Sequence, residues 1–572
     1  MTGVSISYGD IAVGAKESSV PTASEKAPFV NIEQLKGYNL NFPNYANPCE
    51  LYQTVLNGAA EVFPTDTSNK NFGLWSDQIS GSDGRFATPV VLTLTTSEQY
   101  ASQGFTLTFD NYNGIYANDI NIKWYQGGAL LDEKDFTPDN AVYFCREYVS
   151  NFDKVVITFK SINMPYNRLK LRSIDYGYGT VFYGDELGNV KIIQEIDPIS
   201  SQIAINTCDF TLNSKSDIVY SFQRRQPLGI YFEGKLKATT FVKNSKREAQ
   251  RRWKVESEDY IGLLDRIAFY GGIYKSVRAK GLIEEIHNLS GVPFEMSLEF
   301  NNSFVTGYIP FTTCREALMQ IAFAIGAVVD TSNSENVKIY KLSDEITQTI
   351  SKKRTKQGQN FDDEETVTGV EVTEHSYKAV SESTTAYEAE EEGTGNDILV
   401  KFAEPLHDLS ITNGTITSSG ANYAVINANT GCVLSGQKYE HLTSAKRKNN
   451  PNVLANDVER ILAIENATLV NSANSSAVLA RCYDWLVKTM QTNINIIEGK
   501  HVSGGDYAIY GQVKYGKAKY GKSPKVVTYD KPVNVGDVIN CDTKYLGTLS
   551  GRIIKQTFDL NSTTIVKEAI LK

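Results

Sequence analysis

Residues Gly516 to Ser523 match the Gly-x-x-x-x-Gly-Lys-Ser phosphate-loop pattern letter for letter. That pattern binds nucleotides when a helix starts at the Lys-Ser pair, because its backbone amides and dipole then face the phosphates. Here Ser523 is followed by Pro524 and a strand-like run to Asp530. Tyr-Gly pairs also recur every five residues from Tyr510, a pattern that fits a basic strip gripping nucleic acid or, more simply, an exposed hairpin or subunit contact. We therefore expect no nucleotide-binding site.

Nucleophilic and metal chemistry also lack a sequence pattern. The five His residues, at 287, 375, 407, 441 and 501, show neither a helical two-ligand spacing nor a metalloprotease motif. Cys314 precedes Arg315 at an expected helix start, but no sequence partner would make it a nucleophile. Seven scattered Cys without a Cys-x-x-Cys pair favour neither disulfides nor structural zinc. We predict that the chain is not an enzyme; a cell-wall hydrolase is the less favoured alternative.

Two sets of residues in the N-terminal third suggest binding rather than catalysis. Aromatic rings can stack on sugar faces, and carboxylate and amide oxygens are ligands that Ca²⁺ prefers. The predicted glycan-binding residues are Trp75, Tyr112 and Trp124, and the predicted Ca²⁺ ligands are Asp110, Asn113 and Asp119. The favoured alternative is that these residues are core aromatics and an Asx-rich turn. Apart from this Ca²⁺, we expect no cofactor.

Alternating hydrophobic residues dominate the first half of the chain. Residues 1–48 mix Gly, Ser, Pro and Asn and predict an arm laid on a neighbouring surface. Alternation such as Ile120, Ile122 and Trp124 then predicts one β-sandwich over 49–178. Strand-like runs around a turn at Gly234 predict a first small β-barrel over 179–280.

In the second half of the chain, the spacing of hydrophobic residues changes between that of strands and that of helices. A cap at Thr312 or Thr313, helical spacing to Ile325 and then Gly326 predict a helix within a small α/β domain over 281–345. Charged residues over 346–400 predict solvated loops and a linker, with Val370 to Thr373 as a charge-protected edge strand. Residues 401–572 predict a second β-barrel region with an amphipathic helix near 475–491. Its strands 532–539 and 551–560 echo those of the first barrel.

Length and charge limit the classes of partner. A chain of 572 residues exceeds what one core supports, so several domains are expected. Its net charge of −9 gives no general attraction to phosphate backbones or anionic lipids. No apolar run is long enough to span a bilayer, and the first residues lack a secretory signal. We expect synthesis in the cytoplasm and no membrane insertion.

Several runs resemble baseplate hub proteins from long-tailed phages, prophages and phage-tail-like particles of Gram-positive hosts. A hub-like helix and strand are carried by Thr313–Thr331 with Val337–Tyr340, and a hub-like last barrel by Gly551–Leu560 with Ile565–Leu571. The segment Leu74–Ser80, with Asp83–Phe86, resembles a galactose-binding-type jelly roll. The expected fold is therefore mainly β and multi-domain: a jelly-roll β-sandwich plus two related small β-barrels around a small α/β unit.

The resemblance implies a structural role in a virion or tail-like particle, at the baseplate end of the tail. It implies a homotrimer whose paired barrels form a ring of six similar units, joining tail tube to tail tip around a central channel. The implied partners are the chain itself, the tube protein, a tip or spike protein and other baseplate proteins. The alternative is a host-adhesion protein of the tail that binds a cell-surface glycan.

Overall fold

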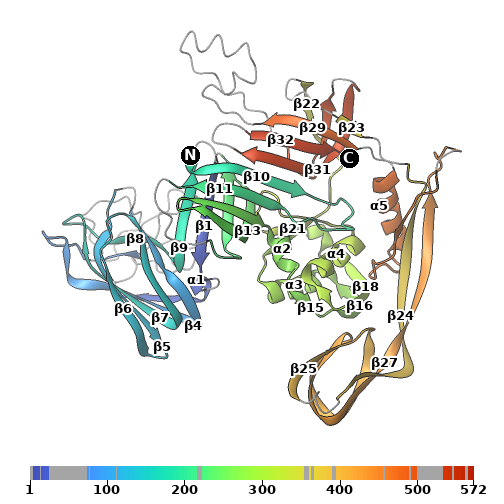
Figure 1. Ribbon diagram of the computed structural model, residues 1–572, viewed down its shortest axis with the longest axis horizontal. Helices are drawn as coiled ribbons and strands as arrows, with labels where there is room; N and C mark the ends of the chain where they lie inside the picture. Colours follow the sequence, from blue (N-terminus) through green and yellow to red (C-terminus); the bar gives the residue numbers. More distant parts are fainter. Residues whose placement is uncertain are drawn as a thin grey trace. The chain divides into compact units, whose positions relative to one another are not determined.

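The computed structural model describes residues 4–12, 15–24, 74–76, 78–110, 113–214, 222–232, 234–352, 360–362, 366–389, 395–454, 458–487, 491–498, 533–543, 546–560 and 565–571. This part of the chain is mainly β, with several separate sheets, which confirms the prediction of a mainly β, multi-domain fold (Figure 1). It divides into a smaller unit, Ser7–Val181, and a larger unit made of Met1–Ile6 and Phe182–Lys572. None of the described helices has the length and apolar content needed to cross a bilayer.

The smaller unit is built on a sheet of seven of the described strands. The strand order is β3-β8-β4-β7-β5-β6, and β2 also pairs with β4. The elements are α1 (Ala15–Ser18), β2 (Val20–Ala23), β3 (Leu74–Trp75), β4 (Arg85–Phe109), β5 (Ala117–Gln126), β6 (Ala129–Phe136), β7 (Val142–Ile162) and β8 (Lys170–Asp175). The segment predicted as an N-terminal arm thus contributes β2 to this sheet.

Alternation builds the core of the smaller unit. In β4, Phe105, Leu107 and Phe109 are fully buried, and in β5 so are Ile120, Ile122 and Trp124. Because successive side chains of a strand point to opposite faces, each of these sets enters the core from one face. Repeated register shifts between β4 and β7 bend these two long strands.

A buried ion pair lies within the smaller unit. The Nζ atom of Lys170 in β8 lies 3.7 Å from Oδ2 of Asp110, and both side chains are 1% exposed. The same carboxylate accepts a hydrogen bond from the Asn113 side chain at 2.7 Å. A charge in such surroundings is tolerated only with its partner present.

Most strands of the larger unit belong to a sheet of 13 of the described strands, joined in the order β23-β29-β32-β31-β10-β11-β14-β13-β12-β1-β9. In addition, β30 pairs with β31, and β22 pairs with β30. Strands β1 and β9 each include residues of both units. A short 3-10 helix, η2 (Gly184–Glu186), precedes β10. The first strand group comprises β1 (Val4–Ile11), β9 (Gly177–Tyr183), β10 (Leu187–Glu195), β11 (Thr207–Asn213), β12 (Pro227–Phe232), β13 (Lys235–Ala249) and β14 (Arg252–Glu258). The second strand group comprises β22 (Ile346–Ile350), β23 (Asn360–Asp362), β29 (Gln491–Glu498), β30 (Val538–Asp542), β31 (Thr548–Leu560) and β32 (Ile565–Leu571).

Both echoing hairpins predicted from the sequence form. Gly234, with φ of +77°, turns β12 into β13, and Phe232 pairs with Lys235. In the second group β30 pairs with β31, from Val538 opposite Arg552 to Asp542 opposite Thr548. Each strand group therefore contains one strand-turn-strand unit of the predicted kind.

A small α/β part sits between the two groups in sequence. Its elements are α2 (Tyr260–Leu264), β15 (Ala268–Phe269), β16 (Gly272–Arg278), α3 (Ala279–Ser290), β17 (Phe294–Met296), the 3-10 helix η3 (Leu298–Phe300), β18 (Phe304–Ile309), β19 (Thr312–Thr313), α4 (Cys314–Ile325), β20 (Val328–Asp330) and β21 (Val337–Tyr340). The predicted helix is α4. The Thr313 hydroxyl accepts a hydrogen bond from the Glu316 amide at 3.2 Å, and Gly326 ends the helix with φ of +78°.

A third part, which we call the hairpin sheet, consists of β24 (Gly369–Glu388), β25 (Gly395–Lys401), β26 (Leu406–Ser419), β27 (Tyr423–Asn449) and β28 (Ile461–Ile464). The prediction of an edge strand at Val370–Thr373 is wrong. Here β24 lies between β27 and β28, and Val370 and Val372 are fully buried. The neighbouring charges suggested solvent, whereas the strand is covered by a partner on each side.

The predicted amphipathic helix is α5 (Ser475–Val487). Its Val478 and Cys482 are buried in a small core that also holds Val370 and Val372 of β24. Arg481 of α5 donates a hydrogen bond to the Phe323 carbonyl at the end of α4, and its guanidinium lies 5.4 Å from the Phe323 ring centre. These contacts fix the hairpin sheet to the α/β part.

The buried ion pair of the smaller unit yields a stability prediction. Lys170→Met leaves the Asp110 carboxylate buried without its cation and is expected to destabilise the full chain by about 3–5 kcal/mol. The control is Lys160→Met, since Lys160 is 32% exposed and forms surface ion pairs with Asp119 and Asp135. Urea unfolding followed by tryptophan fluorescence would measure both. Equal shifts for the two variants would contradict the interpretation.

Candidate functional site

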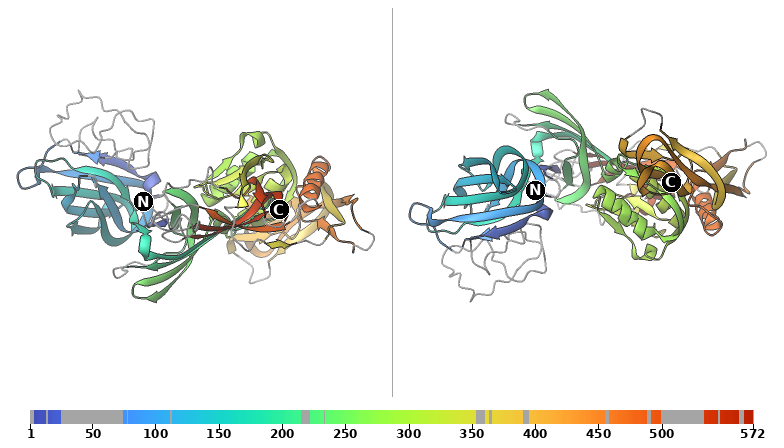
Figure 2. Two further views of the ribbon diagram at one scale, coloured as in Figure 1. Left: turned by 90° about the horizontal axis from the view of Figure 1, so that it is seen from above. Right: turned by 90° about the horizontal axis from the view of Figure 1, so that it is seen from below.

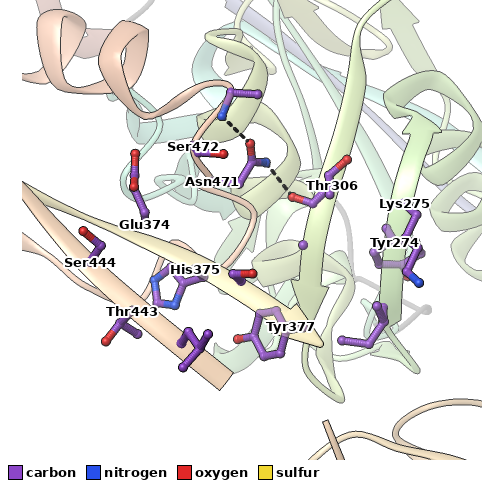
Figure 3. A pocket seen from close by; sticks show the side chains of 15 residues that line it. Tyr274, Lys275, Thr306, Glu374, His375, Tyr377, Thr443, Ser444, Asn471 and Ser472 are labelled. Atoms are coloured by element: carbon purple, nitrogen blue, oxygen red, sulfur yellow. Dashed lines mark hydrogen bonds between the residues drawn. The ribbon is translucent and has the colours of Figure 1, made fainter. Parts of the chain in front are cut away.

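A candidate site in the larger unit is an open cavity of about 560 Å³ beside the base of the hairpin sheet (Figure 3). One wall comes from β16 and β18 of the α/β part and another from β24 and β27. The lining residues are Ile273, Tyr274, Lys275, Thr306, Gly307, Glu374, His375, Ser376, Tyr377, Leu442, Thr443, Ser444, Asn471, Ser472 and Ala473.

His375 lines the hairpin-sheet side of the cavity and contacts a second histidine behind the lining, His441. Nδ1 of His375 in β24 lies 2.9 Å from Nε2 of His441 in β27, and the rings are parallel within 11°. Only one of these two nitrogens can carry the shared proton. The two rings therefore share one proton in a hydrogen bond while both are neutral. Protonation of both rings would place two cations against each other.

Tyrosines extend this stack toward the α/β part. The Tyr377 ring lies parallel to His441 with centres 4.5 Å apart, and Tyr308 of β18 lies 5.2 Å from Tyr377. The Thr468 hydroxyl donates to the Tyr308 carbonyl at 2.5 Å, and the Tyr308 amide donates back to the Thr468 carbonyl. The aromatic stack thus bridges β18 and the two long strands of the hairpin sheet.

Polar contacts close the other end of the cavity. Glu374 lies 2.6 Å from the Lys446 ammonium and accepts a hydrogen bond from Ser475, the first residue of α5. Asn471 donates to the Thr306 carbonyl at 2.8 Å, which Figure 3 shows spanning from the loop before α5 to β18. These bonds tie four separate segments to one another.

The electrostatics favour neutral side chains in the aromatic stack, beside the charged Glu374–Lys446 pair. Burial lowers the pKa of His375 from its ordinary value, and the His441 ring lowers it further, against the opposing effect of the Glu465 backbone. Nε2 of His375 is buried without a hydrogen-bond partner among the described residues. Burial also raises the pKa of Tyr308 to about 12 and that of Tyr377 still higher. At neutral pH the cavity therefore offers hydrogen-bonding groups but no activated nucleophile.

The predicted glycan-binding set is not supported at Trp124. Its side chain is fully buried in the core and stacks on Phe105 with ring centres 6.2 Å apart, so no sugar can reach its face. That prediction is wrong for Trp124, because the alternation that places Ile120 and Ile122 in the core places this ring there too. Trp75 lies in β3 with its side chain outside the described residues, as does all of Tyr112.

The predicted Ca²⁺ ligands are occupied by other contacts. Asp110 is paired with the buried Lys170, and Asn113 donates to that carboxylate. Asp119 instead faces Lys160 and Arg85, at 3.2 and 3.7 Å. Across the described residues, no cluster of three or more His, Cys, Asp or Glu side chains is arranged to hold a metal ion. This geometry does not support the calcium prediction.

The structure describes only one of the two remaining sequence motifs, Cys314. The phosphate-loop match at 516–523 and the Tyr-Gly repeat lie outside the described residues. Cys314 is buried at the start of α4, where burial raises the pKa of its thiol to about 11. A thiol with that pKa is protonated at neutral pH and unsuited to nucleophilic attack.

Sequence reasoning missed the His375–His441 pair. The two residues lie 66 positions apart, and only the register that places Tyr377 opposite His441 brings them together. Single histidines in strand-like runs carry no signal of such a pairing. The alternation of β24 and β27 was the one available clue, and it specifies faces but not partners.

Comparison with known proteins gives weak structural similarity. No protein-family model and no curated protein matches the chain. A tail protein from Neisseria meningitidis MC58 has a TM-score of 0.40 at 12% identity, over 69% of this chain and 93% of its own. The 43 kDa tail protein of prophage MuSo2 from Shewanella oneidensis has 0.40 at 8%, over 69% and 96%. A prophage tail protein from Listeria monocytogenes EGD-e has 0.36 at 11%, over 69% and 91%. At these scores the likeness carries no argument about function.

The histidine pair gives a pH prediction. Local unfolding of β24 and β27 around the cavity would return the pKa of His375 to its ordinary 6.5. Because the pKa is lower than this in the folded structure, such local opening takes up a proton. The stabilisation is complete above pH 6.5 and is lost as the pH falls through the pKa of the folded state. Each unit of depression corresponds to about a tenfold change in the opening equilibrium. Amide hydrogen exchange around Tyr377, corrected for intrinsic rates, should therefore show less protection at pH 5.5 than at 7.5.

The matched variants are His375→Gln and His407→Gln. The first removes the titrating ring and should abolish the difference between the two pH values. His407 contacts Asp408 and the Lys438 carbonyl, away from the cavity lining, so its variant should keep the difference. Equal protection of the wild-type chain at both pH values would refute the prediction.

Proposed function

We propose that this chain is a structural hub of a phage tail or phage-tail-like particle. Three copies form a ring of six similar strand groups that joins the tail tube to the tail tip and leaves a central channel. The proposed partners are further copies of the chain, the tube protein, a tip or spike protein and other baseplate proteins. The proposal starts from the hub-like runs at Thr313–Thr331 and Gly551–Leu571.

The joint between β10 and β31 is the observation that carries the proposal. These strands pair antiparallel from Val190 opposite Leu560 to Glu195 opposite Lys555. Strand groups that are far apart in the sequence are thereby fused into one hydrogen-bonded sheet. A chain that offers two such groups side by side suits a three-fold assembly that must meet a six-fold neighbour.

Buried side chains hold the joint in register. Ile192 and Phe558 lie opposite each other and are almost completely buried. Gln194 and Gln556 are also opposite, and each is buried. The Gln194 amide donates to the Lys237 carbonyl of the first group, whereas the Gln556 amide donates to the Val533 carbonyl before β30 of the second. Slippage by two residues would keep these amides in the interior but move them away from the two carbonyls that they contact.

The joint connects unlike strands. In the first group β10 has β11 as its other neighbour, whereas β31 of the second group pairs with both β30 and β32. Contacts between unlike surfaces are head-to-tail, and a head-to-tail contact that repeats by rotation closes a ring. A similar contact between the second group of one chain and the first group of the next would make the two kinds of strand group alternate around the ring.

The absence of a catalytic role is part of the proposal. Cys314 is buried and protonated, and His375 is held neutral, so neither is an activated group for hydrolysis. The alternative of a glycan-binding adhesin has lost Trp124, and the structure adds no observation in its favour. A structural role therefore remains the better proposal.

The oligomeric state of the purified full-length chain tests the ring. Native mass spectrometry should give three chains, and negative-stain class averages should give six lobes around a channel. Phe558→Ala opens a cavity at the joint and is expected to cost about 3–5 kcal/mol and to reduce ring formation.

The matched control for the joint is Phe109→Ala. Phe109 is as deeply buried but lies in the smaller unit, so its loss of stability should leave the ring intact. Circular dichroism would verify that both variants remain folded. A wild-type chain that stays monomeric at high concentration would overturn the proposal.

A further inference from the structure

One corner of the first strand group carries a concentrated positive charge. We call residues 243–254, at the turn between β13 and β14, the basic hairpin (Figure 2, green). These twelve residues hold six of the chain's 57 basic side chains and one of its 66 acidic ones. The basic hairpin therefore has a net charge of +5, and the other 560 residues together have −14.

A neighbouring segment widens the basic surface. The Arg225 amide donates to the Val242 carbonyl at 2.8 Å, and the Ser245 hydroxyl donates to the Phe222 carbonyl. Residues 222–226 thus run beside the start of the hairpin and add Arg224 and Arg225 to it. Both arginines are exposed, as are Lys246, Arg247, Arg251 and Arg252.

The hairpin is a preformed platform rather than a loose loop. Trp253 is 7% exposed and packs on Phe222 with ring centres 5.7 Å apart, while Arg247 lies over the Trp253 ring. On its other edge β14 pairs with β11 along its whole length, to Arg252 opposite Asn213. Its shape is therefore set before any partner binds, which reduces the entropic cost of docking.

The positive charges of the hairpin lower its stability where they face each other. Lys246 and Lys254 are directly opposite in the register, and like charges at such positions are destabilising. Glu256 relieves Lys254 at 2.9 Å, but Lys246 has no acidic side chain within 4 Å among the described residues. Glu258 neutralises Lys243 at the base of the hairpin, and Glu248 neutralises Arg252 at its turn. Lys246 therefore keeps its full charge at the surface, where it can pair with an acidic side chain of another molecule.

We infer that the basic hairpin docks on an acidic surface of a neighbouring copy of this chain. The inference deepens the proposed ring and rests on it. Two basic hairpins cannot face each other across a two-fold axis, because like charges would meet. A neighbouring copy, whose remaining residues carry −14, supplies the complementary charge at a different surface. The contact is then head-to-tail, as a closed ring of three requires.

Charge reversal tests the inference without threatening the fold. The double variant Arg224→Glu and Lys246→Glu changes two exposed side chains, and the second change places a carboxylate opposite Lys254, which gives a favourable cross-strand pair. The control is Arg146→Glu with Lys341→Glu, an equal change of charge at exposed positions in β7 and directly after β21. Native mass spectrometry over a range of protein concentration would compare both with the wild-type chain, at about 0.1 M and about 1 M salt.

The hairpin variant is expected to need at least about tenfold more protein to assemble, whereas the control should behave as the wild type does. Wild-type assembly should weaken at high salt. A hairpin variant that assembles normally would overturn the docking inference and leave the proposed ring standing. A wild-type chain that never assembles would overturn both. Binding of a double-stranded DNA probe that is lost only in the hairpin variant would identify nucleic acid as the occupant and would overturn docking on a second copy.

Discussion

Six register pairs between β10 and β31 hold together parts of the chain that are more than 350 residues apart. In sequence, the α/β part and the hairpin sheet lie between these two strands, so both begin and end on a common sheet. The pairing must be correct for the rest to be placed, because a slip of one residue would turn Ile192 and Phe558 out of the core. The buried glutamines beside them make the wrong registers costly rather than merely less favourable.

The elements that the sequence predicted well are those whose signals are local. The α4 helix has its cap, its periodic core residues and its terminal glycine within fourteen positions, and Gly234 specifies a turn without reference to anything distant. The α3 helix was missed although Leu282, Ile283 and Ile286 have helical spacing and are buried. Gly281 within the helix and Ser290 at its end weakened the pattern. The hairpin sheet was misjudged for a different reason: the burial of Val370 depends on β27 and β28, and no local residue reports them.

The features of the candidate site also differ in whether a local sequence pattern reports them. The interior position of Trp124 follows from the alternation that was already visible, and the more interesting interpretation of that ring as a sugar platform ignored it. The His375–His441 contact, by comparison, exists only because two long strands pair at one register. Neither histidine has neighbours in sequence that would mark it. The sequence analysis did not single out the basic hairpin, and no local residue reports that Phe222 and Trp253 support it.

Fusing two strand groups into one sheet also changes how a ring would be counted. A ring of six strand groups has six contacts between neighbouring groups. One contact forms inside each of the three chains as that chain folds, so only three contacts remain to be formed between chains. For the internal contacts the effective concentration is set by the chain itself and does not fall when the protein is dilute. The β10–β31 joint would thus make assembly a third-order rather than a sixth-order function of protein concentration, and a particle could begin its tail at low abundance of this chain.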